Sequence, residues 1–194
     1  ISFIMIFAWT FAEPKLMFYI YDDLGWTSAR FGLAMSGYGV ASLLGQTLLG
    51  RSSDRFGRLS IIMVGLLLHS AQYVGMMLTT SYQLITLSYI VAGLGEALVS
   101  PALGAFFLDI TPEQHRSRVM GIKGSVGSFG SVVGPLLAVT ASRSLPPQGV
   151  FLISGALLVS ATMLVLFTQR KRDLADEQHR DTVAEATYYP IVSS

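Results

Sequence analysis

Cysteine is absent from this chain of 194 residues, and charged residues make up only 13% of it, about half the share typical of soluble domains. The missing cysteines exclude disulfide bonds and thiolate chemistry, and three scattered histidines do not suggest a metal site. The few basic residues form no face or arm suited to nucleic acid. We therefore expect no metal, no cofactor and no nucleic-acid partner.

Charge is also unevenly distributed along the chain. Nine of the 25 charged residues fall within residues 170–194, and none occurs between Leu59 and Gly95. Uncharged runs of this length leave no room for the polar helix faces that a soluble fold requires. These runs exclude a soluble enzyme and predict a membrane protein.

Six apolar segments are each close to the length of about 20 residues that a helix needs to cross a bilayer. Polar, glycine or proline residues separate them, and each segment is about twice as long as the strand of a membrane barrel, which has about ten residues. The sequence therefore predicts an all-α membrane protein with a bundle of six transmembrane helices. The expected spans are 1–21, 29–50, 60–79, 83–108, 119–141 and 149–169.

The basic residues predict how this bundle is oriented. Ten of the thirteen lysines and arginines fall in the loops and the tail on one side of the predicted spans, and such an excess marks the cytoplasmic side. We expect a multi-pass protein of the cell membrane with both ends of this unit in the cytoplasm. The tail, 170–194, is polar with mixed charge and is expected to be solvated and largely disordered. Because Ile1 already lies in an apolar run, we expect the chain to be part of a longer protein.

The loop between the second and third spans has the pattern G-x-x-x-D-R-x-G-R, formed by Gly50, Asp54, Arg55, Gly57 and Arg58. Glycines allow a tight turn between antiparallel helices, and a carboxylate beside arginines can form a charge relay or lie against a helix N-terminus. The pattern resembles the signature loop of the major facilitator superfamily of transporters. The resemblance implies that this loop latches the two halves of the protein in one state of the transport cycle. A loop that only sets topology is the alternative, but it would not require these residues at these spacings.

Glycines recur every three or four residues in the fifth span, which indicates a helix face suited to close packing in lipid. Gly121, Gly130, Gly134 and Pro135 resemble the pattern that marks the fifth helix of antiporters in the superfamily. Alanine and valine at 138–139 stand where that pattern ends in two glycines. Helix packing alone explains these residues equally well.

The fourth span contains the segment from Tyr89 to Ala97, which is similar to the fourth-helix motif of the superfamily. Tyr89 occupies the place of an arginine that the second half of the family usually lacks. This substitution, together with the polar tail, implies the C-terminal six-helix half of the fold; the first half is the alternative. At the end of the same span, Asp109 is expected to pair with Arg116 or Arg118.

Two carboxylates and one histidine lie inside predicted spans, where ionisable groups are costly and indicate function. By resemblance, the first and fourth helices line the central cavity. Glu13 and Glu96 are therefore the candidate proton or substrate site, although each could instead make a structural hydrogen bond or ion pair. His69, in the third span, is expected to hydrogen-bond to a neighbouring helix.

The resemblance implies a secondary transporter of a small solute that works by alternating access, with this bundle moving against the missing six-helix half. Proton-coupled export of an organic compound, as in drug antiporters, is the favoured function. The alternatives are an uptake carrier for a sugar or organic acid, a membrane receptor or scaffold without transport activity, and an inactive truncated half. The expected partners are the solute, protons, the other half and the lipid bilayer.

Overall fold

The computed structural model describes residues 1–49 and 52–188, and every regular element in these ranges is a helix. This agrees with the predicted all-α class. The elements in chain order are α1 (Ser2–Phe18), the π-helix η1 (Tyr19–Asp23), α2 (Ser28–Leu49), α3 (Ser52–Phe56), α4 (Arg58–His69), α5 (Ala71–Leu78), α6 (Tyr82–Asp109), the 3₁₀-helix η2 (Glu113–His115), α7 (Arg116–Ser144) and α8 (Pro147–Tyr188).

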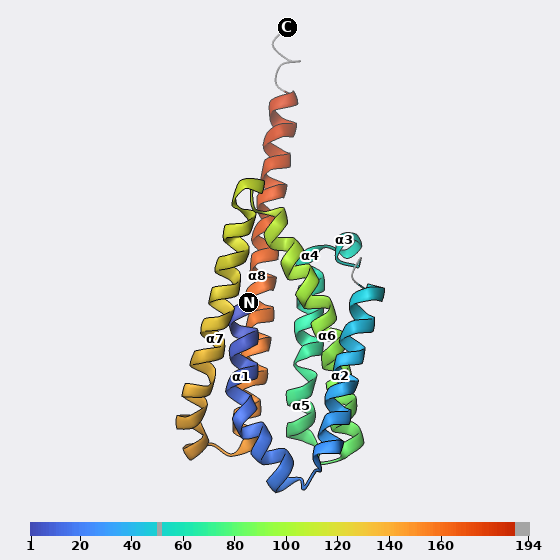
Figure 1. The fold of residues 1–194 in the computed structure, drawn as a ribbon. Coiled ribbons are helices and arrows are strands. Elements are labelled where there is room, and N and C mark those ends of the chain that lie inside the picture. The colour runs from blue at the N-terminus through green and yellow to red at the C-terminus, as the bar shows by residue number, and fades with distance from the viewer. Residues whose placement is uncertain (50–51, 189–194) are drawn as a thin grey trace.

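The long helices form one bundle composed of two groups (Figure 1). In the first group α1 packs against α7 and α8, and in the second α6 packs against α2, α4 and α5. Helix α8 joins the groups because it also packs against α4 and α5. Large buried side chains, such as Leu16, Ile62, Tyr89 and Phe151, fill the core between them.

Within the part of the chain that the structure describes, five helical segments are long and apolar enough to cross a membrane: Ser2–Asp23, Arg58–Leu78, Tyr82–Asp109, Glu113–Ala141 and Pro147–Lys171. The predicted second span, 29–50, forms helix α2 of 22 residues, but α2 is not among these five. Many of its residues are glycine or serine, which lowers its apolar content. Two of these glycines pack closely on α6: a Cβ atom on Gly45 would lie 2.6 Å from the Cβ of Ala97, and one on Gly37 would lie 3.1 Å from the side chain of Ile90. The count of six spans stays a prediction.

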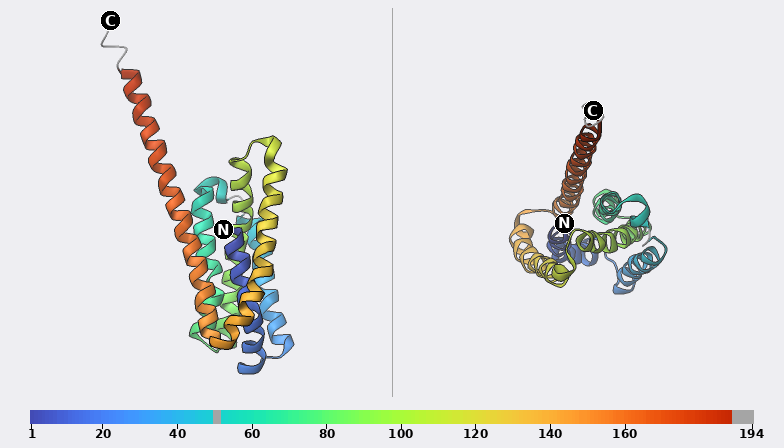
Figure 2. Two further views of the ribbon diagram at one scale, coloured as in Figure 1. Left: turned by 90° about the vertical axis from the view of Figure 1, so that its left-hand side faces the viewer. Right: turned by 90° about the horizontal axis from the view of Figure 1, so that it is seen from above.

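The tail differs from its prediction. Helix α8 continues without a break from the last apolar segment to Tyr188, and Figures 1 and 2 show this extension projecting beyond the bundle. The expected disorder of 170–194 is therefore wrong for the residues up to 188. The physical reason is that residues 170–188 contain neither glycine nor proline and are rich in good helix formers. Once a helix has been nucleated, such residues can extend it at a small cost in free energy.

Candidate functional site

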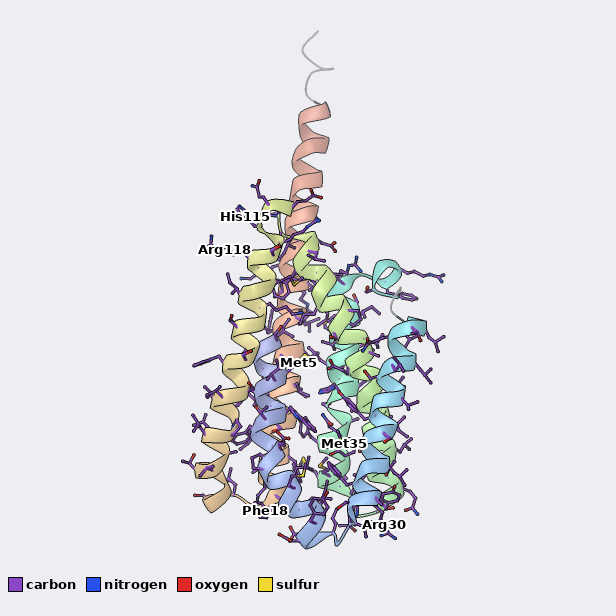
Figure 3. All side chains as sticks on the ribbon, viewed as in Figure 1. Met5, Phe18, Arg30, Met35, His115 and Arg118 are labelled. Atoms are coloured by element: carbon purple, nitrogen blue, oxygen red, sulfur yellow. The ribbon has the colours of Figure 1, made fainter. Side chains whose placement is uncertain are left out.

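A cavity of about 580 Å³ opens between α1 and α7 on one side and α2 and α6 on the other. Its walls are mainly apolar and aromatic, and Met5 and Met35, labelled in Figure 3, contribute from α1 and α2. A few polar side chains interrupt these walls, as is usual for small-molecule sites. They include Tyr38, His69, Gln72, Tyr89, Glu96 and Lys123.

Close packing of α4 on α6 carries His69 and Glu96 to the same wall. A Cβ atom on Gly95 would lie 2.6 Å from the carbonyl oxygen of Gly65 and would also meet the backbone nitrogen of His69. Only glycines allow two helix backbones to come this near. The contact sets the last turn of α4 beside the middle of α6, where Glu96 follows Gly95.

Among the described residues that line this cavity, Glu96 is the one carboxylate. Its side chain is 29% exposed, and its Oε2 lies 3.9 Å from Nδ1 of His69. Lys123 of α7 lines the same cavity. The cavity therefore combines one acidic and one basic side chain in a mainly apolar surface.

His69 is almost fully buried and contacts two polar groups besides Glu96. Its Nδ1 lies 3.3 Å from the carbonyl oxygen of Ala92, and its Nε2 lies 3.4 Å from Nε2 of Gln72. The predicted hydrogen bond of His69 to a neighbouring helix is thereby confirmed, since Ala92 belongs to α6.

Glu13, the other candidate from the sequence, does not lie with Glu96. It is half-buried on α1 next to Pro14, and it is not among the residues that line the cavity. Of the two carboxylates proposed from the sequence, only Glu96 contributes to this wall.

Lys123, Gln72 and Tyr38 line the cavity but are not among the site residues expected from the sequence. Lys123 is one of the ten basic residues expected on the cytoplasmic side, and it lies seven residues after Arg116, where α7 begins. That spacing puts it about two turns, or roughly 10 Å, inside the helix. The one available signal is that Lys123 is the sole charged residue of the expected span 119–141.

The signature loop is described in part. Gly50 lies outside the described residues, as does the side chain of Asp54. Gly57 has φ of 88°, a conformation that side chains with a Cβ rarely adopt, and α4 begins directly after it. Arg55 is exposed, with its guanidinium 5.6 Å from the ring centre of Phe56.

Arg58, the last residue of the loop pattern, connects this loop to α6. Its Nε lies 3.0 Å from Oδ2 of Asp109, and its Nη1 donates a 2.7 Å hydrogen bond to Oγ of Ser53. The expected pairing of Asp109 with Arg116 or Arg118 is therefore wrong. Arg58 is the partner because α4 packs along α6, which brings the start of α4 beside the end of α6, and Arg116 contacts Glu113 instead, at 3.5 Å.

The glycine pattern of α7 faces α1 along part of its length. Cβ atoms on Gly127, Gly130 and Gly134 would meet Ile6, Phe3 and Thr10 of α1, whereas one on Gly121 would meet nothing within 4 Å. Oγ1 of Thr10 also donates a 3.2 Å hydrogen bond to the carbonyl oxygen of Gly130. Helix α7 continues through Pro135, which is half-buried. Packing therefore accounts for Gly130 and Gly134 but not for Gly121.

Comparisons with known proteins agree on one family. The family model described as Major Facilitator Superfamily matches residues 1–188. The class E tetracycline resistance protein of Escherichia coli is 27% identical over 162 residues, which cover 81% of this chain and 40% of that protein. Multidrug resistance protein 2 of Bacillus subtilis (strain 168) is 31% identical over 109 residues, which cover 56% of this chain and 27% of that protein. The match therefore spans less than half the length of each of these relatives.

A solved structure has the same fold. The crystal structure of the human organic anion transporter MFSD10 (TETRAN) superposes with a TM-score of 0.76 at 20% sequence identity. The superposition covers 84% of this chain and 38% of that one.

Proposed function

The chain belongs to the major facilitator superfamily, and from that premise we propose that it forms part of a transporter that exports an organic compound in exchange for protons. Members of this family are multi-pass membrane transporters rather than enzymes. Relatives whose names refer to multidrug and tetracycline resistance support an organic compound as the substrate and export as the direction. The apolar and aromatic lining of the cavity is suited to such a compound.

The proposed mechanism is alternating access. This bundle would move against a second six-helix half, with the substrate bound at the midplane between them. We propose that the chain is the C-terminal half, on the evidence of Tyr89 in the fourth span and of the polar extension of α8. The excess of basic residues at one end of the bundle supports a cytoplasmic C-terminus.

The contact between Arg58 and Asp109 supports a latch at the cytoplasmic face. It joins the signature loop to the end of α6, the helix that carries Glu96. Breaking or forming this contact would therefore release or hold the cytoplasmic end of a helix that lines the cavity. Asp54 and Arg55 are the further residues of the loop to which we assign a gating role.

One observation carries the proposed coupling to protons: Glu96 is a carboxylate in the wall of a mainly apolar cavity, which Lys123 also lines. A carboxyl group at this position can take up a proton when the cavity opens to one side and release it when the cavity opens to the other. Carboxylates inside membrane helices commonly serve this purpose in pumps and transporters.

The test replaces Glu96 with Gln in the full-length protein that contains this chain, reconstituted in lipid vesicles. Glu96→Gln keeps the shape of the side chain but cannot exchange a proton. We expect the variant to lose substrate movement driven by a pH gradient, while exchange of substrate at equal pH persists at near the wild-type rate. Radiolabelled or fluorescent substrate measures both.

Glu13→Gln is the matched control, because Glu13 does not line the cavity. It should retain movement driven by the gradient. Wild-type coupling in Glu96→Gln, or loss of coupling in Glu13→Gln alone, would contradict the assignment of Glu96 as the proton carrier.

A further inference from the structure

The contacts of His69 determine which of its ring nitrogens holds a hydrogen. A backbone carbonyl oxygen can only accept a hydrogen bond. Nδ1 of His69 lies 3.3 Å from the carbonyl oxygen of Ala92, so Nδ1 carries the hydrogen and donates it. Nε2 then needs a donor, and the amide nitrogen of Gln72 lies 3.4 Å from it.

The opposite arrangement would turn the Nδ1 lone pair toward the carbonyl oxygen of Ala92, which would be repulsive. With the amide nitrogen of Gln72 facing the ring, as it does in this structure, the contacts on both nitrogens match a neutral ring with its hydrogen on Nδ1. In this form Nε2 accepts from Gln72 and has no role in proton exchange. Burial strengthens the preference, since His69 is 5% exposed and Gln72 is fully buried.

The hydrogen on Nδ1 lies between two acceptors on the same helix. Ala92 and Glu96 are four residues apart on α6, so the carbonyl oxygen of Ala92 and the carboxylate of Glu96 are neighbours. Nδ1 lies 3.9 Å from Oε2 of Glu96, a little beyond hydrogen-bond distance. A small movement of the carboxylate would bring it to the same hydrogen when the carboxylate is ionised.

Few groups other than His69 could act on the charge of Glu96. On the helices that pack on α6, the titratable groups that line the cavity with Glu96 are Tyr38 from α2, His69 from α4 and Lys123 from α7; Arg30, Arg58, Arg116 and Arg118 of these helices are not among its lining residues. Tyr73, from α5, faces Tyr89 and Tyr38 instead. Of these groups, His69 has a ring nitrogen 3.9 Å from the carboxylate of Glu96 and a ring held by contacts at both nitrogens.

We propose that His69 is a positioning residue for the proton carrier: as a fixed neutral donor, it hydrogen-bonds through Nδ1 to Glu96 when the carboxylate is ionised, and it takes up no proton itself. This inference rests on the proposed function, because it assigns a partner to the residue that carries the proton. The donor stabilises the ionised state of Glu96 and so sets the pH at which the carrier releases its proton.

Two variants of His69 distinguish the effect of the hydrogen-bond donor from the effect of the packing of the ring. His69→Asn places an amide N–H close to the position of Nδ1 and cannot ionise, whereas His69→Phe keeps a ring but has no donor. Infrared spectroscopy of the purified full-length protein, with Glu96→Gln to assign the carboxyl band, measures the pH midpoint at which Glu96 titrates.

We expect the midpoint to rise by about one pH unit in His69→Phe, a tenfold change in proton affinity, which is the scale of one hydrogen bond to a charged group. It should stay within a few tenths of a unit of the wild type in His69→Asn. His115→Phe is the control, because His115 is exposed near the cytoplasmic end of α7. A purely structural role would lower the thermal stability of both His69 variants and leave both midpoints unchanged, which would overturn the proposal.

A second measurement applies even if His69→Phe does not fold. Nitrogen NMR of the wild-type protein labelled at histidine, with His69→Asn for assignment, reports which ring nitrogen is protonated. A neutral ring with its hydrogen on Nδ1, throughout the pH range in which Glu96 titrates, supports the proposal. A hydrogen on Nε2, or a doubly protonated ring in that range, overturns it.

Failure of the proposed function would look different. If Glu96→Gln keeps its coupling in vesicles while the infrared midpoint of Glu96 still depends on the donor at residue 69, the pairing of His69 with Glu96 stands and proton-coupled transport through Glu96 fails. If the midpoint does not depend on that donor while Glu96→Gln abolishes coupling, proton-coupled transport through Glu96 stands and the pairing of His69 with Glu96 fails.

Discussion

The hydroxyl group of Tyr89 is expected to lower the stability of the folded protein. Its ring is fully buried against the core, but its hydroxyl group has no hydrogen-bond partner among the described residues. A buried hydroxyl without a partner costs about 1–3 kcal/mol. We therefore expect Tyr89→Phe to leave thermal stability unchanged or to raise it. The melting temperature of the purified full-length protein in detergent checks this.

Tyr19→Phe is the matched control, because the hydroxyl of Tyr19 donates a 3.4 Å hydrogen bond to the carbonyl oxygen of Met76. Its removal should lower stability by about 1 kcal/mol. If Tyr89→Phe lowers the melting temperature as much as Tyr19→Phe, the hydroxyl of Tyr89 has a partner, such as a bound water molecule, and the prediction is wrong.

At the scale of helices, the contact of α7 with α1 depends on the absence of side chains. A Cβ atom on Gly134 would overlap Oγ1 of Thr10 and lie 3.0 Å from the backbone nitrogen of Phe11. We expect Gly134→Ala to force the helices apart and to reduce stability by about 1–3 kcal/mol. Thermal unfolding of the full-length protein measures the loss.

Gly121→Ala provides the comparison, since its Cβ would meet nothing within 4 Å and alanine favours a helix over glycine by up to about 1 kcal/mol. Its stability should be equal to or above that of the wild type. A drop in transport by Gly121→Ala without a drop in stability would favour an antiporter function for the pattern at this position. Equal destabilisation by both variants would refute the packing explanation.

For the whole molecule, the connections between helices lie at two opposite ends of the bundle (Figure 1). Helix α7 runs from one end to the other over 29 residues, or roughly 43 Å. Ser117 and Ser144 lie near its two ends. The basic loops predict that Ser117 is on the cytoplasmic side and Ser144 outside.

We expect a membrane-impermeant thiol reagent to label Ser144→Cys but not Ser117→Cys in intact cells, and to label both after the cells are lysed. The native chain has no cysteine of its own, so the labelling reports the introduced residue, provided that the rest of the full-length protein is also free of cysteine. Labelling of Ser117→Cys alone in intact cells would invert the proposed orientation.

The positions of the helices could be predicted from the sequence, because a membrane helix depends on local features. A run of apolar residues of sufficient length specifies where a helix crosses, and its backbone hydrogen bonds lie within the same segment. The segments predicted at 60–79, 83–108 and 119–141 correspond to Arg58–Leu78, Tyr82–Asp109 and Glu113–Ala141. The tail is the exception: its polar composition predicts disorder, but its residues also favour a helix, and α8 continues through it to Tyr188.

Which side chains meet could not be predicted, because it depends on how each helix is rotated and how closely it approaches the next. Close approach at Gly95 brings His69 of α4 beside Glu96, and the packing of α4 along α6 brings Arg58 to Asp109. Lys123 is assigned to the cavity only when α7 is placed beside the other helices. The sequence by itself therefore determined the family and the positions of the long apolar helices, and it made Glu96 a candidate site residue, whereas the tertiary structure decided which residues are its neighbours. The reason is that these contacts join residues far apart in the chain, and no local pattern specifies the angle at which two helices cross.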